Sequence, residues 1–277
     1  MTSNTHENAP TRLINVDGLQ TAYRRFGRPG GVPLLMLNYF AAHMDNWDPA
    51  ITNGLATHSE VVLFDYPGVG SSAGETPRAV ETMTAQLVAL CRMLDLKAFD
   101  VVGFSLGGMI AQQLAAEHPG MVRRIILLGT GPRGGEGMTF TELSADELAD
   151  EASLLMNAFF TLSEAGREAG HAYLNRLKLR ADDRDAPVSQ KSATAQLEAI
   201  RDWGQIPGKD RYAMLGKIRQ PTLVVHGSKD VVVMPINAFI LGQHLPNAHL
   251  VMYPDASHGA QSQYAEEFLE RARRFLN

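Results

Sequence analysis

The sequence predicts an α/β fold, in which a mostly parallel sheet is flanked by helices. Six short runs rich in Val, Ile and Leu do not alternate with polar residues, which is the pattern of strands buried on both faces of a sheet. Helical segments lie between most of these runs, and such alternation is typical of parallel sheets. The six runs are Pro33–Leu37, Glu60–Phe64, Phe99–Phe104, Arg124–Leu128, Thr222–His226 and His249–Tyr253.

A β-hairpin is expected before these strands. Asp17-Gly18 lies between two extended runs, Arg12–Val16 and Leu19–Phe26. Asp-Gly is a strong signal for a two-residue hairpin turn, because both central residues of that turn need a positive φ. The two hairpin strands and the six buried strands together give an eight-stranded sheet.

Three further segments repeat apolar residues at helical spacing. They are Thr82–Leu94, Leu106–Glu117, and a last segment at about Gln263–Leu276. Pro119 and Gly120 mark the end of the second one. We expect these helices to cover the sheet.

One interval breaks the alternation, because no clear strand lies between Gly129 and Thr222. It opens with a Gly-rich link, and the capping-box pattern Ser144-Ala145-Asp146-Glu147 then indicates the start of a helix. Apolar residues continue at helical spacing to Phe159. Two more helices are expected, near Glu164–Lys178 and Ser189–Trp203.

The length of 277 residues suits one domain with a sizeable insertion. We interpret residues 133–212 as a helical cap over the carboxyl edge of the sheet. Residues 1–132 and 213–277 then form the core that carries the cap. Hydrophobic residues make up 45% of the chain, which is enough for a globular core without disulfides.

Composition argues against several classes of partner. The formal net charge is −5 and no strongly basic patch is visible, so nucleic acid is not an expected partner. No Cys/His cluster or phosphate-cradling loop suggests a metal or an organic cofactor. The single cysteine, Cys91, lies in a helical stretch and is expected to be a buried thiol. Met1–Thr11 lacks a signal-peptide core and no apolar run is long enough for a bilayer, so we expect a cytoplasmic monomer or homodimer without membrane contact.

The stretch that indicates chemistry is Gly-x-Ser-x-Gly, from Gly103 to Gly107, between a predicted strand and a predicted helix. A serine on so sharp a turn has a strained backbone, and glycines two residues before and after it relieve the crowding. The helix N-terminus behind Ser105 favours developing negative charge. A plain Gly-rich turn is the alternative, but the flanking strand and helix favour Ser105 as a nucleophile.

A serine hydroxyl needs a base, and a histidine is expected in that role. The chain has nine histidines, so their positions must decide. His258 follows the last predicted strand and precedes the final helix, which places it near Ser105 at the carboxyl ends of the strands. The other candidates are expected to be packing or surface residues: His43, His118, His226, His244 and His249. Of these, His43 lies near a loop of the expected site and could itself contact substrate.

The base needs a carboxylate that holds its tautomer. Asp230 follows the penultimate strand, and this gives the order serine, acid, histidine. Gly-Ser-Lys-Asp could also be an ordinary turn that ends in an aspartate. Asp255 is too near His258 along the chain to reach behind its ring. The segment after the preceding strand, Gly129–Pro132, contains no carboxylate, which favours Asp230 further.

These motifs together resemble the α/β-hydrolase superfamily, in its capped esterase and haloperoxidase-like branch. The resemblance covers nearly the whole chain and rests on Gly103–Gly108, Gly227–Asp230 and Ser257–Gly259. The segment Asp65–Ser72 is similar to a glycine-rich loop of that family, in which we expect Asp65 to bond backbone amides. The resemblance implies acyl transfer through an acyl-enzyme on Ser105, with no cofactor.

One segment departs from the family pattern. Relatives carry His-Gly after the strand that ends at Leu37, whereas this chain has Asn38-Tyr39-Phe40. By alignment, the backbone N–H groups of Phe40 and Leu106 should hold the oxyanion. Tyr39 replaces a glycine, so its N–H is the alternative donor. Loss of one such donor typically costs about 2.7–4 kcal/mol in the transition state.

The substrate is expected to be a small or medium, mainly apolar ester or lactone. The expected substrate contacts are Tyr39, Phe40, Met156, Phe159 and Trp203. Met138, Phe140 and Phe160 are further candidates for an apolar roof, although packing between cap helices would explain each of these side chains equally well.

Three further activities could use the same three residues. A carbon–carbon bond hydrolase would use a cap arginine for a carboxylate, for which Arg176, Arg180 and Arg184 are candidates. A cofactor-free perhydrolase is a second option. A slow-turnover ligand-binding receptor belongs to another functional class, and the unusual Asn38-Tyr39-Phe40 segment keeps it open.

Overall fold

The computed structural model describes residues 4–138, 144, 146 and 150–277. Its strands are β1 (Arg12–Val16), β2 (Leu19–Gly27), β3 (Leu34–Leu37), β4 (Glu60–Phe64), β5 (Phe99–Phe104), β6 (Val122–Leu128), β7 (Thr222–Gly227) and β8 (Ala248–Tyr253). Its α-helices are α1 (Pro49–Ala56), α2 (Val80–Met93), α3 (Leu106–Glu117), α5 (Glu151–Phe159), α6 (Glu164–Leu177), α7 (Gln190–Gly204), α8 (Ile236–His244), α9 (Ala260–Gln263) and α10 (Ala265–Leu276).

The strands form one eight-stranded sheet in the order β1-β2-β4-β3-β5-β6-β7-β8. The pairs β1–β2 and β2–β4 are antiparallel, and the other neighbouring pairs are parallel. Asp17 and Gly18 have φ angles of 49° and 90°, as the expected hairpin turn requires. The predicted sheet is therefore confirmed, with strand ends that differ by one or two residues.

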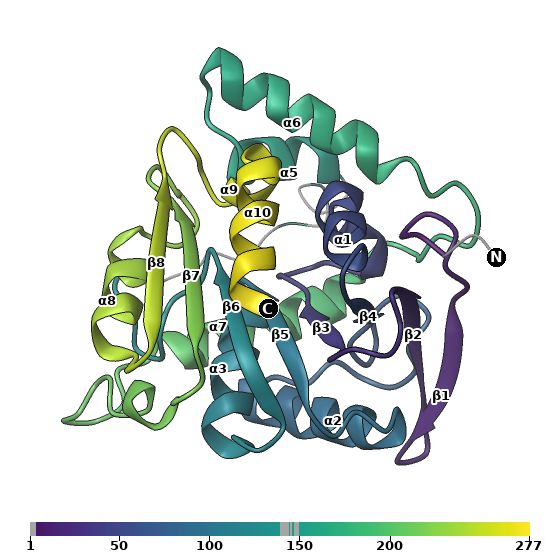
Figure 1. Cartoon of the computed structure of the whole chain (residues 1–277), viewed down its shortest axis with the longest axis horizontal. Coiled ribbons are helices and arrows are strands. Elements are labelled where there is room, and N and C mark those ends of the chain that lie inside the picture. Colours follow the sequence, from purple (N-terminus) through teal and green to yellow (C-terminus); the bar gives the residue numbers. More distant parts are fainter. Residues whose placement is uncertain (1–3, 139–143, 145, 147–149) are drawn as a thin grey trace.

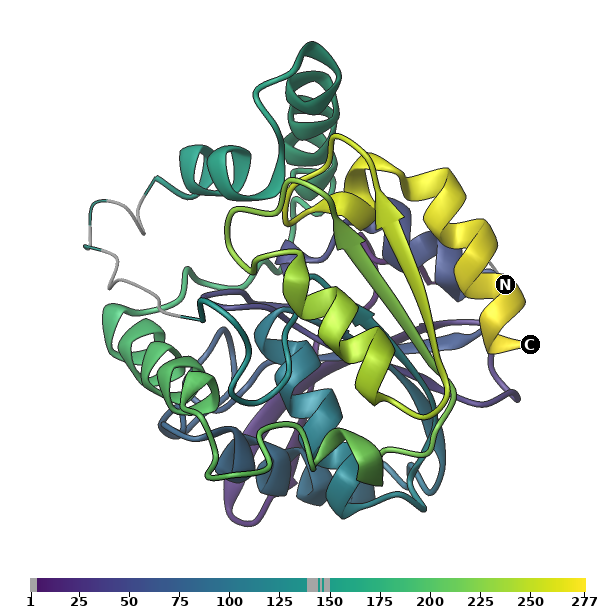
Figure 2. The ribbon, with the colours of Figure 1, turned by 90° about the vertical axis from the view of Figure 1, so that its left-hand side faces the viewer.

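Helices cover both faces of this sheet (Figures 1 and 2). One hydrophobic cluster joins α2, α3 and α8 to one face, and a second joins α1 and α10 to the other. Val101 and Val102, successive residues of β5, belong to different clusters and are both fully buried. Burial on both faces explains why the strands do not alternate with polar residues.

The helices between β6 and β7 occupy two places. In Figure 1, α5 and α6 lie beyond the carboxyl ends of β7 and β8, whereas α7 packs against α2 and adds Trp203 to the core. The helices expected near Glu164–Lys178 and Ser189–Trp203 are confirmed as α6 and α7. Ser163 and Ser189 cap them by accepting backbone N–H groups of their first turns. Of the expected capping box, only Ser144 and Asp146 lie within the described residues.

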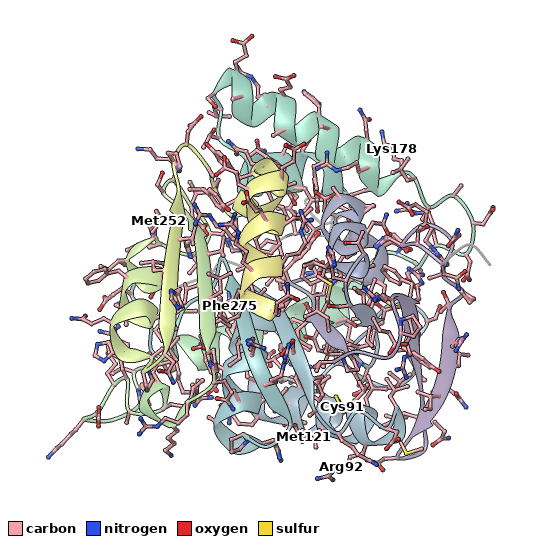
Figure 3. All side chains as sticks on the ribbon, in the orientation of Figure 1. Cys91, Arg92, Met121, Lys178, Met252 and Phe275 are labelled. Carbon is pink, nitrogen blue, oxygen red and sulfur yellow. The ribbon has the colours of Figure 1, made fainter. Side chains whose placement is uncertain are left out.

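Two further expectations concern the last helix and the cysteine. The expected final helix is confirmed as α10, and the short helix α9 precedes it. Tyr264 lies between the two helices, where its ring stacks on Tyr253 and its hydroxyl donates to the Pro254 carbonyl. Cys91 is buried in α2, as predicted, and burial raises the pKa of its thiol to about 12 (Figure 3). Within the described residues, no helix has both the length and the apolar character needed to cross a bilayer.

Candidate active site

Ser105 lies on a sharp turn between β5 and α3. Its φ and ψ angles are 51° and −113°, which is a strained conformation for a residue with a side chain. The surrounding structure holds this conformation: the Ser105 N–H donates to the Leu128 carbonyl at 2.9 Å, and the Thr130 hydroxyl donates to the Ser105 carbonyl at 2.8 Å.

The glycines around Ser105 leave no room for a side chain. A Cβ at Gly103 would lie 2.8 Å from the Cα of Gly108. A Cβ at Gly107 would overlap the Leu37 carbonyl oxygen and lie 2.8 Å from that of Asn38. The expected crowding is therefore present, and at Gly107 it comes from the end of β3.

His258 and Asp230 form a buried pair. The Nδ1 atom of His258 lies 2.8 Å from Oδ2 of Asp230, and the other carboxylate oxygen accepts the N–H groups of Val232 and Val233 at 2.8 and 2.9 Å. Burial by itself raises the pKa of the Asp230 carboxyl, but His258 and His226 outweigh this effect and hold it below its usual range. The carboxylate is therefore ionised and oriented toward the ring.

The loop that carries His258 is fixed from two sides. A Cβ at Gly227 would overlap the backbone of Ala256 and Ser257, so β7 approaches this loop closely. On the other side, the Gly259 N–H donates to the Phe159 carbonyl at the end of α5, at 2.9 Å. The contact with α5 makes the position of His258 depend on the helices inserted between β6 and β7.

The imidazole of His258 is enclosed by apolar groups. Its centroid lies 5.0 Å from that of Phe104 and 5.6 Å from that of Phe159. A Cβ at Gly129 would lie 3.0 Å from its Nδ1 atom. This packing limits the orientations that the ring can take.

Among the competing side chains, Asp255 points elsewhere. It accepts a hydrogen bond from the Ser163 hydroxyl at 2.7 Å and is exposed. His226 was expected to be a packing residue, but its Nε2 atom lies 3.0 Å from Oδ2 of Asp230. Sequence reasoning missed this contact, because it depends on how the turn after β7 folds back toward the strand.

The segment after β3 brings backbone donors close to Ser105. The Tyr39 N–H donates to Oδ1 of Asn38 at 3.0 Å, and the Asn38 amide donates to the His43 carbonyl at 2.6 Å. Among the described residues, no acceptor engages the Phe40 N–H. The Leu106 N–H is in the first turn of α3, where helices leave donors without internal partners. Tyr39 is thus the less suitable of the two candidate donors in this segment.

Ser105 and His258 line the same cavity, which has a volume of about 450 Å³. Tyr39, Phe40 and Phe159 line it as expected. The remaining lining residues, which sequence reasoning did not single out, are Met109, Gly137, Leu154, Leu155, Ala158, Leu197, Ile200, Val231, Val232 and Met234. Within the described residues, the wall contains no charged side chain.

The structure places two predicted contact residues away from this cavity. Trp203 is fully buried in the core, donates to the Gly131 carbonyl at 3.2 Å and lies under the Arg133 guanidinium. Met156 lies on the side of α5 that faces Gly170 of α6. Their neighbours on the same helices, Ile200 and Leu155, line the cavity instead.

Two of the further roof candidates, Met138 and Phe160, are also absent from the described wall. Met138 is buried against Gly131 and Gly204, and Phe160 packs on Tyr173 with ring centroids 5.5 Å apart. Phe140 lies outside the described residues.

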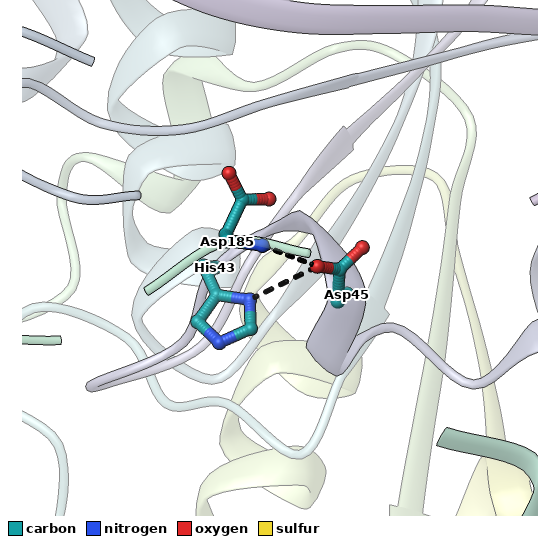
Figure 4. Close-up of side chains that lie close together, drawn as sticks. All are labelled: His43, Asp45 and Asp185. Atoms are coloured by element: carbon teal, nitrogen blue, oxygen red, sulfur yellow. Dashed lines mark hydrogen bonds and ion pairs between the residues drawn. The ribbon is translucent and has the colours of Figure 1, made fainter. Parts of the chain in front are cut away.

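A second polar cluster lies beneath the segment after β3 (Figure 4). His43, Asp45 and Asp185 approach each other there, with a His43 Nδ1 to Asp45 Oδ2 distance of 4.0 Å. Arg24 is fully buried and pairs with both carboxylates, at 2.9 Å from Asp185. Since the guanidinium already supplies the positive charge, this donor set does not call for a metal ion.

Asp65 lies at the edge of the same cluster. Its Oδ1 atom accepts the Met44 N–H at 2.8 Å, so the expected bond to a backbone amide is confirmed. Burial, together with the nearby Asp185, raises the pKa of the Asp65 carboxyl well above its usual range. The cluster therefore fixes the segment that carries the candidate oxyanion donors.

The three arginines considered as partners for a carboxylate are engaged in other bonds. Arg176 pairs with Asp48 through two bonds of 2.8 Å. Arg180 lies 3.4 Å from Asp45, and Arg184 donates to the Leu177 carbonyl at 2.7 Å. These three arginines are absent from the described wall of the Ser105 cavity.

Comparison with known proteins identifies the family. Residues 32–263 match the family model described as alpha/beta hydrolase fold. The pimeloyl-[acyl-carrier protein] methyl ester esterase of Nitrosospira multiformis is 30% identical over 257 residues, which cover 88% of this chain and 94% of the relative.

Two solved structures are also similar. An alpha/beta hydrolase fold protein from Chitinophaga pinensis has 40% identity and a TM-score of 0.93, with 99% of each chain covered. Est816, described as an N-acyl homoserine lactone degrading enzyme, has 27% identity and a TM-score of 0.74, with 96% of this chain and 100% of that chain covered.

Proposed function

Because this chain belongs to the α/β-hydrolase family, we propose that it is a serine hydrolase that cleaves a carboxylic ester or lactone. Ser105 attacks the carbonyl carbon while His258 takes the hydroxyl proton, and Asp230 stabilises the resulting imidazolium. The N–H groups of Leu106 and Phe40 hold the oxyanion. His258 then protonates the leaving alcohol, and water hydrolyses the acyl-enzyme by the same steps.

The main support for this proposal is the shared position of the three side chains. Ser105 and His258 line a single cavity, and the carboxylate of Asp230 lies directly behind His258 at 2.8 Å. Neither the fold nor the family fixes the reaction by itself, because one fold hosts many chemistries. A nucleophile on a strained turn, facing the same space as a buried and oriented histidine, supports acyl transfer.

The wall of the cavity supports a neutral, mainly apolar substrate. Its volume of about 450 Å³ is three times that of a ~150 Å³ cavity that holds benzene. A charged group would find no charged partner in the described part of this wall and would be costly to bury there. We therefore propose an uncharged ester of medium size, with both its acyl and its alcohol part in contact with apolar side chains.

Lactone hydrolysis is the second candidate. It is favoured by the similarity to Est816, whose description names a lactone with an acyl chain. A lactone has the same carbonyl chemistry, and its leaving alcohol stays attached to the acyl group. The apolar wall of the cavity suits an acyl chain.

Carbon–carbon bond hydrolysis and perhydrolysis receive less support. A carbon–carbon bond hydrolase would need a cation for a carboxylate, but Arg176 and Arg180 pair with aspartates elsewhere and Arg184 donates to a backbone carbonyl. Perhydrolysis would use the same three groups as a side activity, which is measurable with hydrogen peroxide. A cap of residues 133–212, a cytoplasmic location and a monomeric or homodimeric state remain predictions from the sequence.

The test is hydrolysis of p-nitrophenyl esters of increasing acyl length, alongside N-acyl homoserine lactones. We expect turnover that is greatest for esters of medium length and that is lost in Ser105→Ala. Ser59→Ala is the matched control, because Ser59 lies before β4 and is not part of the cavity wall.

A folded protein that turns over none of these substrates would contradict the proposal and favour a ligand-binding receptor. Equal turnover by the native protein and by Ser105→Ala would show that another group does the chemistry. Preference for the lactones over every linear ester would favour the second candidate.

A further inference from the structure

His226 is a buried polar residue that the proposed mechanism does not yet use. It lies in β7, four residues before Asp230, and its side chain is inaccessible to solvent. Its Nε2 atom is 2.8 Å from the Val233 carbonyl oxygen and 3.0 Å from Oδ2 of Asp230. Its Nδ1 atom has no partner among the described residues.

These contacts decide which nitrogen of His226 carries the proton. Both groups near Nε2 are acceptors, so Nε2 must be the donor. A second proton on Nδ1 would place an N–H group without a partner in the interior, which is costly. The neutral ring protonated on Nε2 therefore satisfies the surroundings best, and its N–H is shared between Val233 and Asp230.

The shared N–H completes the set of bonds around the Asp230 carboxylate. Oδ1 accepts two backbone N–H groups, from Val232 and Val233, while Oδ2 lies between His226 and His258. The two amides fix one oxygen of the carboxylate, and His226 fixes the other. Each of these bonds favours the ionised form.

We propose that His226 is a positioning residue for the Asp230–His258 pair. This inference rests on the proposed function, since it assigns His226 a part in orienting the acid of that mechanism. The His226 N–H holds Oδ2 of Asp230 where it faces the Nδ1 proton of His258. Without that bond, the carboxylate is free to turn about its remaining amide bonds, and it holds the imidazolium less well in the transition state.

The test compares two substitutions of similar length. His226→Gln keeps an N–H donor near the position of Nε2, whereas His226→Met removes it. We expect His226→Met to lower kcat by about tenfold or more with little change in KM, because a hydrogen bond to a charged group is lost. His226→Gln should recover most of that loss.

A spectroscopic measurement separates positioning from simple loss of stability. The Nδ1 proton of His258 bonds to a carboxylate and should give a downfield proton NMR signal, which we expect to shift or broaden in His226→Met and to persist in His226→Gln. An unchanged signal and unchanged kcat in a folded His226→Met would overturn the inference, while leaving the proposed function intact. By contrast, activity that survives Ser105→Ala overturns the proposed function itself.

If His226→Met does not fold, the native protein still decides the question. Nitrogen-15 NMR of the histidine rings should show His226 as the neutral tautomer protonated on Nε2. A ring protonated on Nδ1 instead could not donate to Asp230 and would refute the inference.

Discussion

Substitution of Gly107 by alanine tests how closely the nucleophile turn depends on the packing of α3 against β3. The added methyl group would overlap the Leu37 carbonyl oxygen and lie 2.8 Å from the Asn38 carbonyl oxygen. Both are backbone atoms, so a change of rotamer cannot relieve the overlap. The start of α3 and the end of β3 must instead move apart by on the order of 1 Å.

That movement acts on the two candidate oxyanion donors in opposite directions. Leu106 begins α3, and Phe40 follows the end of β3, so a separation of the two elements widens the space between their N–H groups. A misplacement of about 1 Å can cost about 100-fold in rate. Overpacking of the core should also cost about 1–3 kcal/mol of stability.

The matched control is Gly120→Ala, in the turn after α3, where an added Cβ meets no atom within 4 Å. We expect Gly120→Ala to leave kcat/KM within about twofold and the free energy of unfolding within about 1 kcal/mol of the native value. Both variants would be measured by ester turnover and by urea unfolding. Full activity in Gly107→Ala would refute the argument that the turn has no room for a side chain.

Three buried groups give further expected outcomes. Asp230→Asn should lower kcat/KM about ten-thousandfold in the turnover assay. Because the pKa of Asp230 is lower in the native protein than in the unfolded chain, its carboxylate stabilises the fold above about pH 4, and this stabilisation is lost as the pH falls further. The Tm of the variant should therefore fall less steeply with acid than that of the native protein. Arg24→Met removes the guanidinium that pairs with Asp185, and it leaves Asp45 with Arg180 alone, so it should cost about 3–5 kcal/mol in urea unfolding. Arg25→Met, which breaks a partly exposed pair with Glu60, should cost about 1 kcal/mol or less. Because Cys91 is buried, it should resist iodoacetamide in the native protein at mildly alkaline pH and should react once urea unfolds the protein, as measured by mass spectrometry. Rapid labelling of the native protein would contradict this burial.

The sheet and the turn that carries Ser105 could be predicted because their causes are local. Burial on both faces leaves its pattern within each strand, and the crowding at Gly103 comes from Gly107 and Gly108 of the same turn, although the crowding at Gly107 comes from the end of β3. The pairing of His258 with Asp230 followed from strand order, since the carboxyl ends of neighbouring parallel strands meet at one edge.

The wall of the cavity could not be predicted in the same way. Met156 and Leu155 are adjacent apolar residues of α5, and the rotation of that helix decides which of them faces Ser105. That rotation depends on contacts with α6 and with the His258 loop. The same limit applied to Trp203, whose apolar character fits both a pocket and a core.

Two details depended on side-chain geometry. The proposal of Phe40 over Tyr39 as oxyanion donor rests on Asn38, whose side chain engages the Tyr39 N–H. His226 was expected to be a packing residue, but the turn after β7 folds back and brings Asp230 to its ring.

The most direct test of the proposed mechanism is to trap the acyl-enzyme. The native protein would be incubated with an activated ester whose acyl group is slow to leave, or with a fluorophosphonate, and then digested and mapped by mass spectrometry. We predict one adduct, on Ser105, which is absent from Ser105→Ala and forms more slowly in Asp230→Asn. An adduct on another residue, or ester hydrolysis without any adduct on Ser105, would contradict the mechanism.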